Sequence, residues 1–339
     1  MLHWSNMQHI IHIKNNKKHL DLRWRIIRAI REFFWEKEFI EVETPHILVL
    51  PGQEPYLSPM RVPVSNERGE VTESYLHTSP EYTMKKMLAA GYENIFSLSK
   101  CFRDYESFGG NHNPEFTMVE WYRTGVDFYT IMQDLEDLFS YVTECLGEDI
   151  LSPFETPSFI RYHMRDLWKE TIGVDLNEYL STERMYTLCV ERGYSPAENE
   201  RYEDLFYRIF LNEIEPKLEQ MGGVILHHYP AQMAALSELS KEDPRYAERF
   251  EVYIGGIELA NAFSDLTDVD EQRKRLEEER ALRKKLGKDV YDIDEEFLYA
   301  VKHLPTCSGI ALGVDRFVQI LLGCDNIDDV LPLPMSKMI

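Results

Sequence analysis

Apolar side chains recur at helical spacing in two stretches of the chain, and this periodicity predicts amphipathic helices over residues 19–39 and 128–146. The apolar stripe of the first consists of Leu22, Ile26, Ile27, Ile30, Phe33 and Phe34, and that of the second consists of Ile131, Leu135, Leu138, Phe139 and Val142. The first helix leads into a short strand over residues 40–43, which Pro45 ends because proline cannot donate to a ladder. A helix followed by an edge strand suits a dimer surface, and the pattern is equally consistent with packing on the chain's own core.

Two further segments combine turn signals with regular structure. Residues 76–87 begin as a strand end and continue as a helix, with Pro80 near its first position and Thr78 or Ser79 as the cap. Residues 249–263 read as a β-hairpin around a Gly-Gly turn.

The remaining patterns are mainly helical. Residues 269–286 predict a highly charged helix with the i,i+4 ion pairs Glu271–Arg275 and Glu279–Arg283. The region from about 145 to 220 reads as a mixed helical insertion in which no chemistry stands out. Strands joined by hairpins, with helices beside them, indicate an α+β fold built on an antiparallel β-sheet flanked by helices.

Composition and charge narrow the class of protein. Of the 339 residues, 44% are hydrophobic and 28% are charged, and no apolar run reaches the length of a membrane span. The five cysteines are scattered with no CxxC pair, which is typical of reduced thiols, so we expect a cytoplasmic protein without membrane attachment. The formal net charge of −22 argues against nucleic acid, tRNA included, as a main partner.

The predicted hairpin brings two glutamates together. With a two-residue turn, Glu251 pairs with Ala260, so Glu251 and Glu258 are diagonal neighbours on one face, roughly 7–8 Å apart. A hard cation such as Mg²⁺, bridging carboxylates and nucleotide phosphates, would relieve their repulsion, and a solvated acidic face is the alternative. Asn261 faces the other side of a regular strand, so a bulge near residues 259–260 is required if it shares a site with Glu258.

Two arginines stand where regular elements end or begin. Arg103 ends its predicted strand, and Arg316 lies in the first turn of a helix, where a cation opposes the helix dipole. Planar guanidinium groups on rigid elements can hold a polyphosphate through paired hydrogen bonds. Asp315 offers a simpler explanation for Arg316, as helix cap and ion partner. Together with the glutamate pair, the arginines predict a site for ATP and a metal ion.

These segments, in this order, resemble the signature motifs of class II aminoacyl-tRNA synthetases, and specifically those of the lysyl-type subgroup. The matching segments are residues 40–45 (IEVETP) for motif 1, residues 102–117 for motif 2, residues 309–316 (GIALGVDR) for motif 3, and the lysyl-type stretches 78–82 (TSPEY) and 258–268 (ELANAFSDLTD). The resemblance extends over most of the chain from about residue 20.

Within this family the chain is similar to the truncated lysyl-tRNA synthetase paralogues that modify elongation factor P. About 20 residues precede the first predicted helix, too few for an anticodon-binding domain, and Ala311-Leu312-Gly313 replaces the Gly-Ile-Gly of synthetases. The resemblance therefore implies a single catalytic domain over residues 1–339 with the class II synthetase fold. It also implies a homodimer that activates (R)-β-lysine as an adenylate, using ATP and Mg²⁺, and transfers it to a lysine side chain of elongation factor P.

The resemblance also assigns roles by position. Arg103 and Arg316 are the expected catalytic residues, holding the α-phosphate and the γ-phosphate. The expected ATP-binding residues are Arg103, Asp104, Tyr105, Glu106, His112, Asn113, Phe116, Glu258, Leu259, Gly313 and Arg316. The expected amino-acid-binding residues are Ser79, Pro80, Glu81, Tyr122, Asn261, Asp265 and Ala311. The expected magnesium ligands are Glu251 and Glu258.

Three departures from the family pattern keep alternatives open. Tyr105 stands where the family has glutamate, in a loop that is one residue longer, and Ala262 and Asp265 replace a glycine and a glutamate. One alternative is adenylation of lysine or another diamino acid for a different acceptor. A second alternative is a catalytically silent dimeric paralogue that senses a metabolite or binds a partner, and the retained phosphate-binding residues argue against it.

Overall fold

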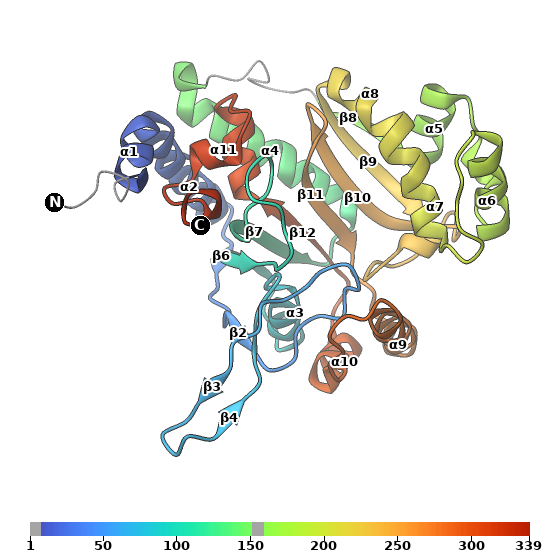
Figure 1. Cartoon of the computed structure of the whole chain (residues 1–339), viewed down its shortest axis with the longest axis horizontal. Helices are drawn as coiled ribbons and strands as arrows, with labels where there is room; N and C mark the ends of the chain where they lie inside the picture. The colour runs from blue at the N-terminus through green and yellow to red at the C-terminus, as the bar shows by residue number, and fades with distance from the viewer. Residues whose placement is uncertain (1–7, 151–158) are drawn as a thin grey trace.

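The computed structural model describes residues 8–150 and 159–339, which fold around one eight-stranded sheet (Figure 1). In spatial order its strands are β1 (Ile40–Glu41), β6 (Asn94–Phe102), β7 (Glu115–Thr124), β12 (Cys307–Gly313), β11 (Ile257–Ser264), β10 (Tyr246–Ile254), β9 (Gly223–Pro230) and β8 (Ile160–His163). Neighbouring strands from β6 to β9 run antiparallel, whereas the edge strands β1 and β8 pair in parallel. The predicted α+β fold is confirmed, and its antiparallel sheet acquires two parallel edges.

The helices form layers on the sheet and a cluster at one side. They are α1 (Gln8–Asn15), α2 (Lys17–Glu36), α3 (Glu81–Ala89), α4 (Phe128–Leu146), α5 (Met164–Ile172), α6 (Thr182–Glu191), α7 (Tyr202–Ile209), α8 (Glu215–Leu218), α9 (Val269–Lys285), α10 (Glu295–His303) and α11 (Val314–Leu321). Two small hairpins, β2 (Ile47–Leu48) with β5 (Tyr75–Leu76) and β3 (Val64–Ser65) with β4 (Val71–Thr72), lie outside the main sheet. No helix in these described ranges is both long and apolar enough to cross a membrane.

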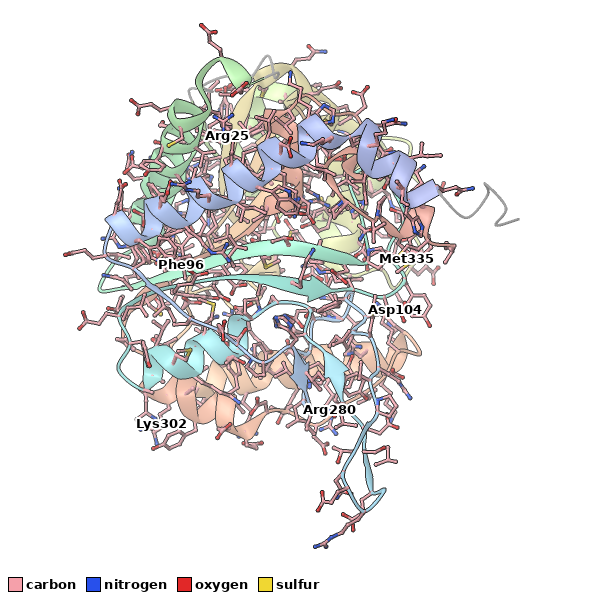
Figure 2. All side chains as sticks on the ribbon, turned by 90° about the vertical axis from the view of Figure 1, so that its left-hand side faces the viewer. Arg25, Phe96, Asp104, Arg280, Lys302 and Met335 are labelled. Atoms are coloured by element: carbon pink, nitrogen blue, oxygen red, sulfur yellow. The ribbon has the colours of Figure 1, made fainter. Side chains whose placement is uncertain are left out.

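The main core lies between the sheet and the helices α2, α4 and α11. Ile26, Leu135 and Phe317 from these helices are at most 1% exposed and belong to one cluster with Trp121 and Ile310 of the sheet. Figure 2 shows α2, which carries the labelled Arg25, crossing this face, while α3 and α10 lie on the other side of the strands. Burial of each large apolar side chain stabilises the fold by roughly 1.5–3 kcal/mol. The core therefore determines which face of the sheet is buried here, and with it which side chains lie on the opposite face.

A second core lies between the insertion and the far end of the sheet. Helices α5 to α8 surround Trp168 and Phe206, which are fully buried against residues of β9 and β10. The insertion also contains β8, which extends the main sheet by pairing with β9. In this register Tyr162 lies beside Leu226. Residues 151–158 of the predicted insertion lie outside the described residues.

Several local predictions change in detail. The strand predicted over residues 40–43 pairs only at Ile40–Glu41. Pro80 itself precedes α3, and no side chain caps that helix, although the Ser79 Oγ lies 3.5 Å from the Glu81 nitrogen. Pro80 therefore lies next to the first helical residue, near its predicted position, whereas the predicted cap at Thr78 or Ser79 is wrong.

The two ion pairs predicted in α9 have different outcomes. The Glu271–Arg275 pair is present, with Oε1 and Nε 2.9 Å apart. The Glu279–Arg283 prediction is wrong, because other acceptors occupy the buried guanidinium of Arg283. It donates instead to the backbone carbonyls of Glu54 and Leu57 at 2.7 and 2.9 Å.

Candidate active site

One row of sheet positions brings side chains from four strands together on the face opposite the main core. The register aligns Glu120 of β7 with Ala311 of β12, Ala311 with Asn261 of β11, and Asn261 with Glu251 of β10. Adjacent strands lie about 4.7–4.9 Å apart, so residues far apart in sequence become neighbours. Side chains alternate across a sheet, and therefore Trp121 and its neighbours face the core while this row faces outward.

A bulge in β11 determines which residues share this face. Tyr253 pairs with Glu258, but Val252 already pairs with Ala260, which leaves Leu259 as an extra residue. Glu251 therefore lies opposite Asn261, and the pairing with Ala260 predicted from a regular hairpin is wrong. The bulge is at the predicted place, and it lets Glu258 and Asn261 line the same cavity.

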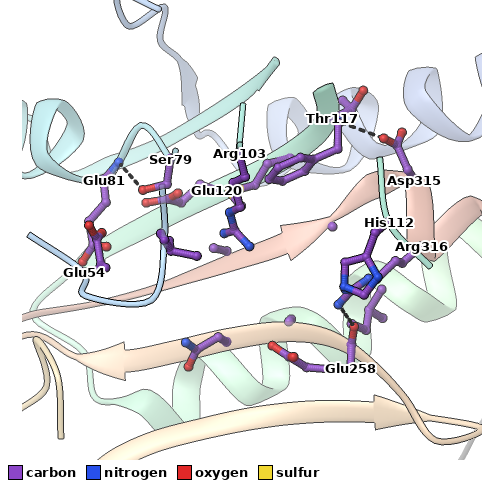
Figure 3. Close-up of a pocket in the computed structure, with 18 of the residues that line it drawn as sticks. Glu54, Ser79, Glu81, Arg103, His112, Thr117, Glu120, Glu258, Asp315 and Arg316 are labelled. Atoms are coloured by element: carbon purple, nitrogen blue, oxygen red, sulfur yellow. Dashed lines mark hydrogen bonds between the residues drawn. The ribbon is translucent and has the colours of Figure 1, made fainter. Parts of the chain in front are cut away.

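Glu120, Ala311 and Asn261 of this row line a cavity of about 330 Å³, whereas Glu251 lies outside its lining. The expected site residues that line it are Ser79, Glu81, Arg103, Glu106, His112, Asn113, Phe116, Glu258, Leu259, Asn261, Ala311, Gly313 and Arg316. Figure 3 shows a carboxylate group at one end (Glu54, Glu81 and Glu120), Arg316 and Glu258 at the other, and Arg103 between the two. The cavity thus has an acidic end and a guanidinium end.

Arg316 is held by backbone carbonyls near the start of α11. It donates from Nη1 to the Glu258 carbonyl at 2.7 Å, from Nε to the Asn111 carbonyl at 3.1 Å, and from Nη2 to His112 Nε2 at 3.0 Å. Burial and the charge of Arg316 lower the pKa of His112, which favours the neutral imidazole that accepts this bond. The side chain is therefore oriented without a carboxylate partner.

The simpler explanation of Arg316 through Asp315 is wrong. The Asp315 carboxylate lies 2.6 Å from Arg23 Nη2 of α2 and accepts a hydrogen bond from the backbone nitrogen of Thr117 at 2.9 Å. Both side chains of the Arg23–Asp315 pair are 2% exposed. This buried pair ties α2 and α11 to the sheet, and Asp315 pairs with Arg23 instead of with Arg316.

Arg103 leaves part of its guanidinium uncommitted. Its carbon Cζ lies 5.0 Å from the centre of the Phe116 ring, which supports the planar group. Its buried Nε has no hydrogen-bond partner within residues 8–150 and 159–339. A buried donor without a partner costs free energy, so a ligand with acceptor oxygens would be stabilised here.

Glu120 dominates the acidic end, and it was missed from the sequence. Its side chain is 1% exposed, Oε1 accepts a hydrogen bond from the Tyr122 hydroxyl at 2.6 Å, and Oε2 has no partner in the described part of the chain. Burial and the nearby charge of Glu81 raise its pKa well above the ordinary value. Strand alternation could have indicated Glu120 from the sequence, because it is two residues before the expected site residue Tyr122 and therefore faces the same side of the strand.

Tyr122 does not line the cavity but positions Glu120. Its ring lies flat against Gly309 of β12, where a Cβ atom would come within 2.1 Å of the ring carbon Cε1. Register explains the contact, because Tyr122 and Gly309 are directly paired on neighbouring strands. Only a glycine leaves room for the ring in this place.

Asp265, expected in the amino-acid pocket, does not line the cavity. Its Oδ1 lies 2.6 Å from the Nζ of Lys85, a buried residue of α3 that pattern analysis did not single out. The same Nζ donates to Oε1 of Glu81 at 2.6 Å. Lys85 therefore connects the cavity-lining Glu81 to the more deeply buried Asp265.

Other expected residues also lie away from the cavity. Pro80 precedes α3, and Asp104 accepts a hydrogen bond from the Tyr105 nitrogen in the motif 2 loop. The Tyr105 side chain is 90% exposed, with a backbone φ of 61°. Glu106, the next residue in this loop, lines the cavity.

The two expected metal ligands differ in their surroundings. Glu251 is buried, with Oε1 2.5 Å from Arg249 Nη2 and Oε2 accepting from the hydroxyls of Tyr229 at 2.6 Å and Tyr253 at 2.7 Å. Glu258 is exposed on the cavity wall. Partial desolvation there and the charge of Glu251 raise the pKa of Glu258 to about 7, although Arg316 and Arg103 oppose this shift.

This donor set fits a hard cation that also binds a ligand. The repulsion between the two glutamates would be relieved by Mg²⁺, for which carboxylate oxygens are suitable ligands. The described residues contain no group of three or more histidine, cysteine, aspartate or glutamate side chains arranged to hold a metal ion. Oxygens of a bound nucleotide would therefore have to complete the coordination.

Comparison with known proteins agrees with this geometry. The family of class II tRNA synthetases (D, K and N) matches residues 6–337. An elongation factor P–(R)-β-lysine ligase of Avibacterium paragallinarum is 39% identical over 321 residues, covering 93% of this chain and 94% of the relative. Proteins of the same name from Hamiltonella defensa and Pectobacterium carotovorum are 36% and 39% identical, covering 98% and 93% of this chain and 98% and 94% of the relatives. The chain therefore belongs to the class II tRNA synthetase family and, within it, to the group of the elongation factor P–(R)-β-lysine ligases.

Proposed function

We propose that this protein is an ATP-dependent ligase that activates (R)-β-lysine as an adenylate and transfers it to a lysine side chain of elongation factor P. The names of the relatives support the substrate and the acceptor. The observation that carries the proposal is the two-ended cavity, in which the uncommitted Arg103 lies between an acidic end and Arg316 (Figure 3). Such a cavity matches a molecule with ammonium groups at one end that reacts with a polyphosphate at the other.

The first step joins the substrate carboxylate to the α-phosphorus of ATP. One carboxylate oxygen attacks in line, the bond to the β-phosphate oxygen breaks, and pyrophosphate leaves. In this proposal Arg103, which lies between the two ends of the cavity, holds the α-phosphate, and Arg316 holds the γ-phosphate. Catalysis then rests on positioning and on electrostatic stabilisation of the developing charge, without a protein nucleophile.

The second step moves the acyl group to the acceptor. The uncharged amine of the acceptor lysine attacks the acyl carbon, AMP leaves with the electrons of the broken acyl–phosphate bond, and the amine releases a proton. Glu120 and Glu81 would keep the two ammonium groups of the substrate in place during both steps, since each presents a carboxylate to the cavity.

We propose that Glu258 and Glu251 hold Mg²⁺ beside the nucleotide. The ion would neutralise part of the negative charge of the phosphates. Glu258 would bind it directly from the cavity wall, and the contacts with two tyrosine hydroxyls and Arg249 would fix the orientation of Glu251.

We also propose that the chain acts as a homodimer of single catalytic domains in the cytoplasm, where translation factors act. Trp24 and Trp35 are 50% and 52% exposed on one side of α2, and Ile40 of the adjoining edge strand is 52% exposed. Sedimentation of Trp35→Glu should show a monomer if this surface forms the dimer, and an unchanged dimer would contradict it.

The two cores belong to one domain in this proposal, because β9 and β10 contribute side chains to both.

Amino-acid-dependent ATP–pyrophosphate exchange tests the proposed function. (R)-β-Lysine, α-lysine and ornithine are compared in parallel, and purified elongation factor P is then added to follow the mass increase of the acceptor. Exchange strongest with (R)-β-lysine, followed by modification of the factor, is the expected result. Exchange with another diamine would replace the substrate, and ATP binding without any exchange would favour the silent paralogue.

A further inference from the structure

A lysine of the chain itself occupies the space between two carboxylates at the acidic end of the cavity. Lys85 Nζ lies 2.6 Å from Glu81 Oε1 and 2.6 Å from Asp265 Oδ1. The side chains of Lys85, Glu81 and Asp265 are 3%, 13% and 0% exposed. Glu81 and Lys85 share a face of α3 at i,i+4 spacing, and β11 ends next to Asp265, so two separate elements fix the arrangement.

The carboxylates beside Lys85 favour its charged form. Burial lowers the pKa of Lys85, but the adjacent charges of Asp265 and Glu81 raise it by more, so the net shift is upward. The second oxygen of Asp265 is also engaged, since Oδ2 lies 3.4 Å from the Cys307 thiol that donates to it. Both oxygens of Asp265 therefore contact protein groups and neither lines the cavity.

Glu81 and Glu120, unlike Asp265, present carboxylate groups to the cavity. Glu81 gives Oε1 to Lys85 and still lines the cavity, and Glu120 Oε2 has no partner among the described residues. Glu54 lies at the same end, where burial and the charge of Glu81 raise its pKa and the charges of Arg103 and Arg283 oppose this. The ammonium of Lys85 thus cancels the charge of one carboxylate in the group that surrounds the substrate amines.

We propose that Lys85 is a positioning residue that sets selectivity for a diamino acid, by withdrawing Asp265 from substrate binding and leaving Glu81 and Glu120 for the two ammonium groups. The inference rests on the proposed function, because it concerns how that same cavity recognises its amino acid. The substrate carries one positive charge at each of its two amines. The number of carboxylates in the cavity that no protein cation neutralises therefore determines how strongly a diamino acid is preferred over an analogue that lacks the second amine.

The test compares three variants that change the local charge in steps. Asp265→Asn adds one positive charge, Lys85→Met adds one negative charge, and the double variant Lys85→Met/Asp265→Asn restores the wild-type sum. The readout is the ratio of kcat/KM in ATP–pyrophosphate exchange for (R)-β-lysine over 3-aminohexanoate, an analogue without the second amine. We expect this ratio to fall about tenfold in Asp265→Asn, to rise in Lys85→Met, and to return to within about threefold of wild type in the double variant.

A structural role alone would give a different pattern. Breaking a buried ion pair destabilises the fold and lowers the rate with both substrates together, which leaves their ratio unchanged. An unchanged ratio in a folded single variant would overturn the proposal. If Lys85→Met does not fold, Lys85→Gln removes the same charge, keeps a hydrogen-bonding group and takes its place in the test. Absence of exchange with (R)-β-lysine in the wild-type protein would instead refute the proposed function.

Discussion

Replacement of Gly309 by alanine should weaken amino-acid binding without touching the cavity itself. The new Cβ would lie 2.1 Å from Tyr122 Cε1, and reaching an ordinary contact of 3.4 Å requires the ring to move by about 1.3 Å. Such a movement breaks the 2.6 Å hydrogen bond from the Tyr122 hydroxyl to Glu120. A hydrogen bond to a charged group is worth about 1.5–3 kcal/mol, which corresponds to a rise of roughly 10- to 150-fold in KM for the diamino acid.

Steady-state exchange at varied amino acid and at varied ATP measures this effect. KM for ATP should stay within about twofold of wild type, because Arg103 and Arg316 line the cavity and Gly309 does not. Tyr122→Phe should raise KM for the amino acid by a similar factor, since it removes the same hydroxyl without a clash. In a Tyr122→Ala background, Gly309→Ala should add nothing further.

The reasoning would be refuted by a folded Gly309→Ala protein with unchanged KM for the amino acid. Thermal unfolding is the control for folding, because overpacking a core costs typically about 1–3 kcal/mol. A loss of stability with normal KM would mean that Tyr122 keeps its bond to Glu120 by moving together with the strand.

Three further predictions concern the phosphate end and the cavity floor. Arg316→Ala should abolish adenylate formation, by at least about a hundredfold in exchange, while circular dichroism and sedimentation remain those of the wild type; near-normal exchange would contradict the role of Arg316. Ala311→Gly should shift the kcat/KM ratio toward α-lysine, because Ala311 lies between Glu120 and Asn261 in the row, and an unchanged ratio would exclude Ala311 as a determinant. Between pH 4.5 and about 7 the folded protein keeps a proton on Glu258 that the unfolded chain has released, so the free energy of unfolding should fall as pH rises through this window. Urea denaturation across this range should show a smaller fall in Glu258→Gln, and equal slopes would argue against the raised pKa.

The sequence predicts best where one physical effect decides. The helix expected over residues 128–146 is α4 with the same bounds, because its apolar stripe is wholly buried and Asp127 caps it through the Thr130 nitrogen. Strand alternation also showed that Glu258 and Asn261 could share a site only with a bulge near residues 259–260, and β11 has a bulge there.

Long-range pairing explains what could not be predicted. Lys85 reads as an ordinary helix residue until the fold brings Asp265 beside it, 180 positions later in the chain. The partner of Asp315 is likewise on a distant helix, so local sequence suggested Arg316 instead of Arg23. The parallel pairing of β1 and β8 depends on crossover connections that leave no mark in a short strand sequence.

The extra residue Leu259 divides β11 into two halves of opposite parity. Positions before it present even-numbered residues such as Glu258 to the cavity, and positions after it present odd-numbered residues such as Asn261 and Phe263. Substitutions after the bulge can therefore alter the amino-acid side of the cavity while the phosphate side stays intact. A single deletion within the strand would instead move one half out of phase, so we expect relatives to vary here by substitution and not by length.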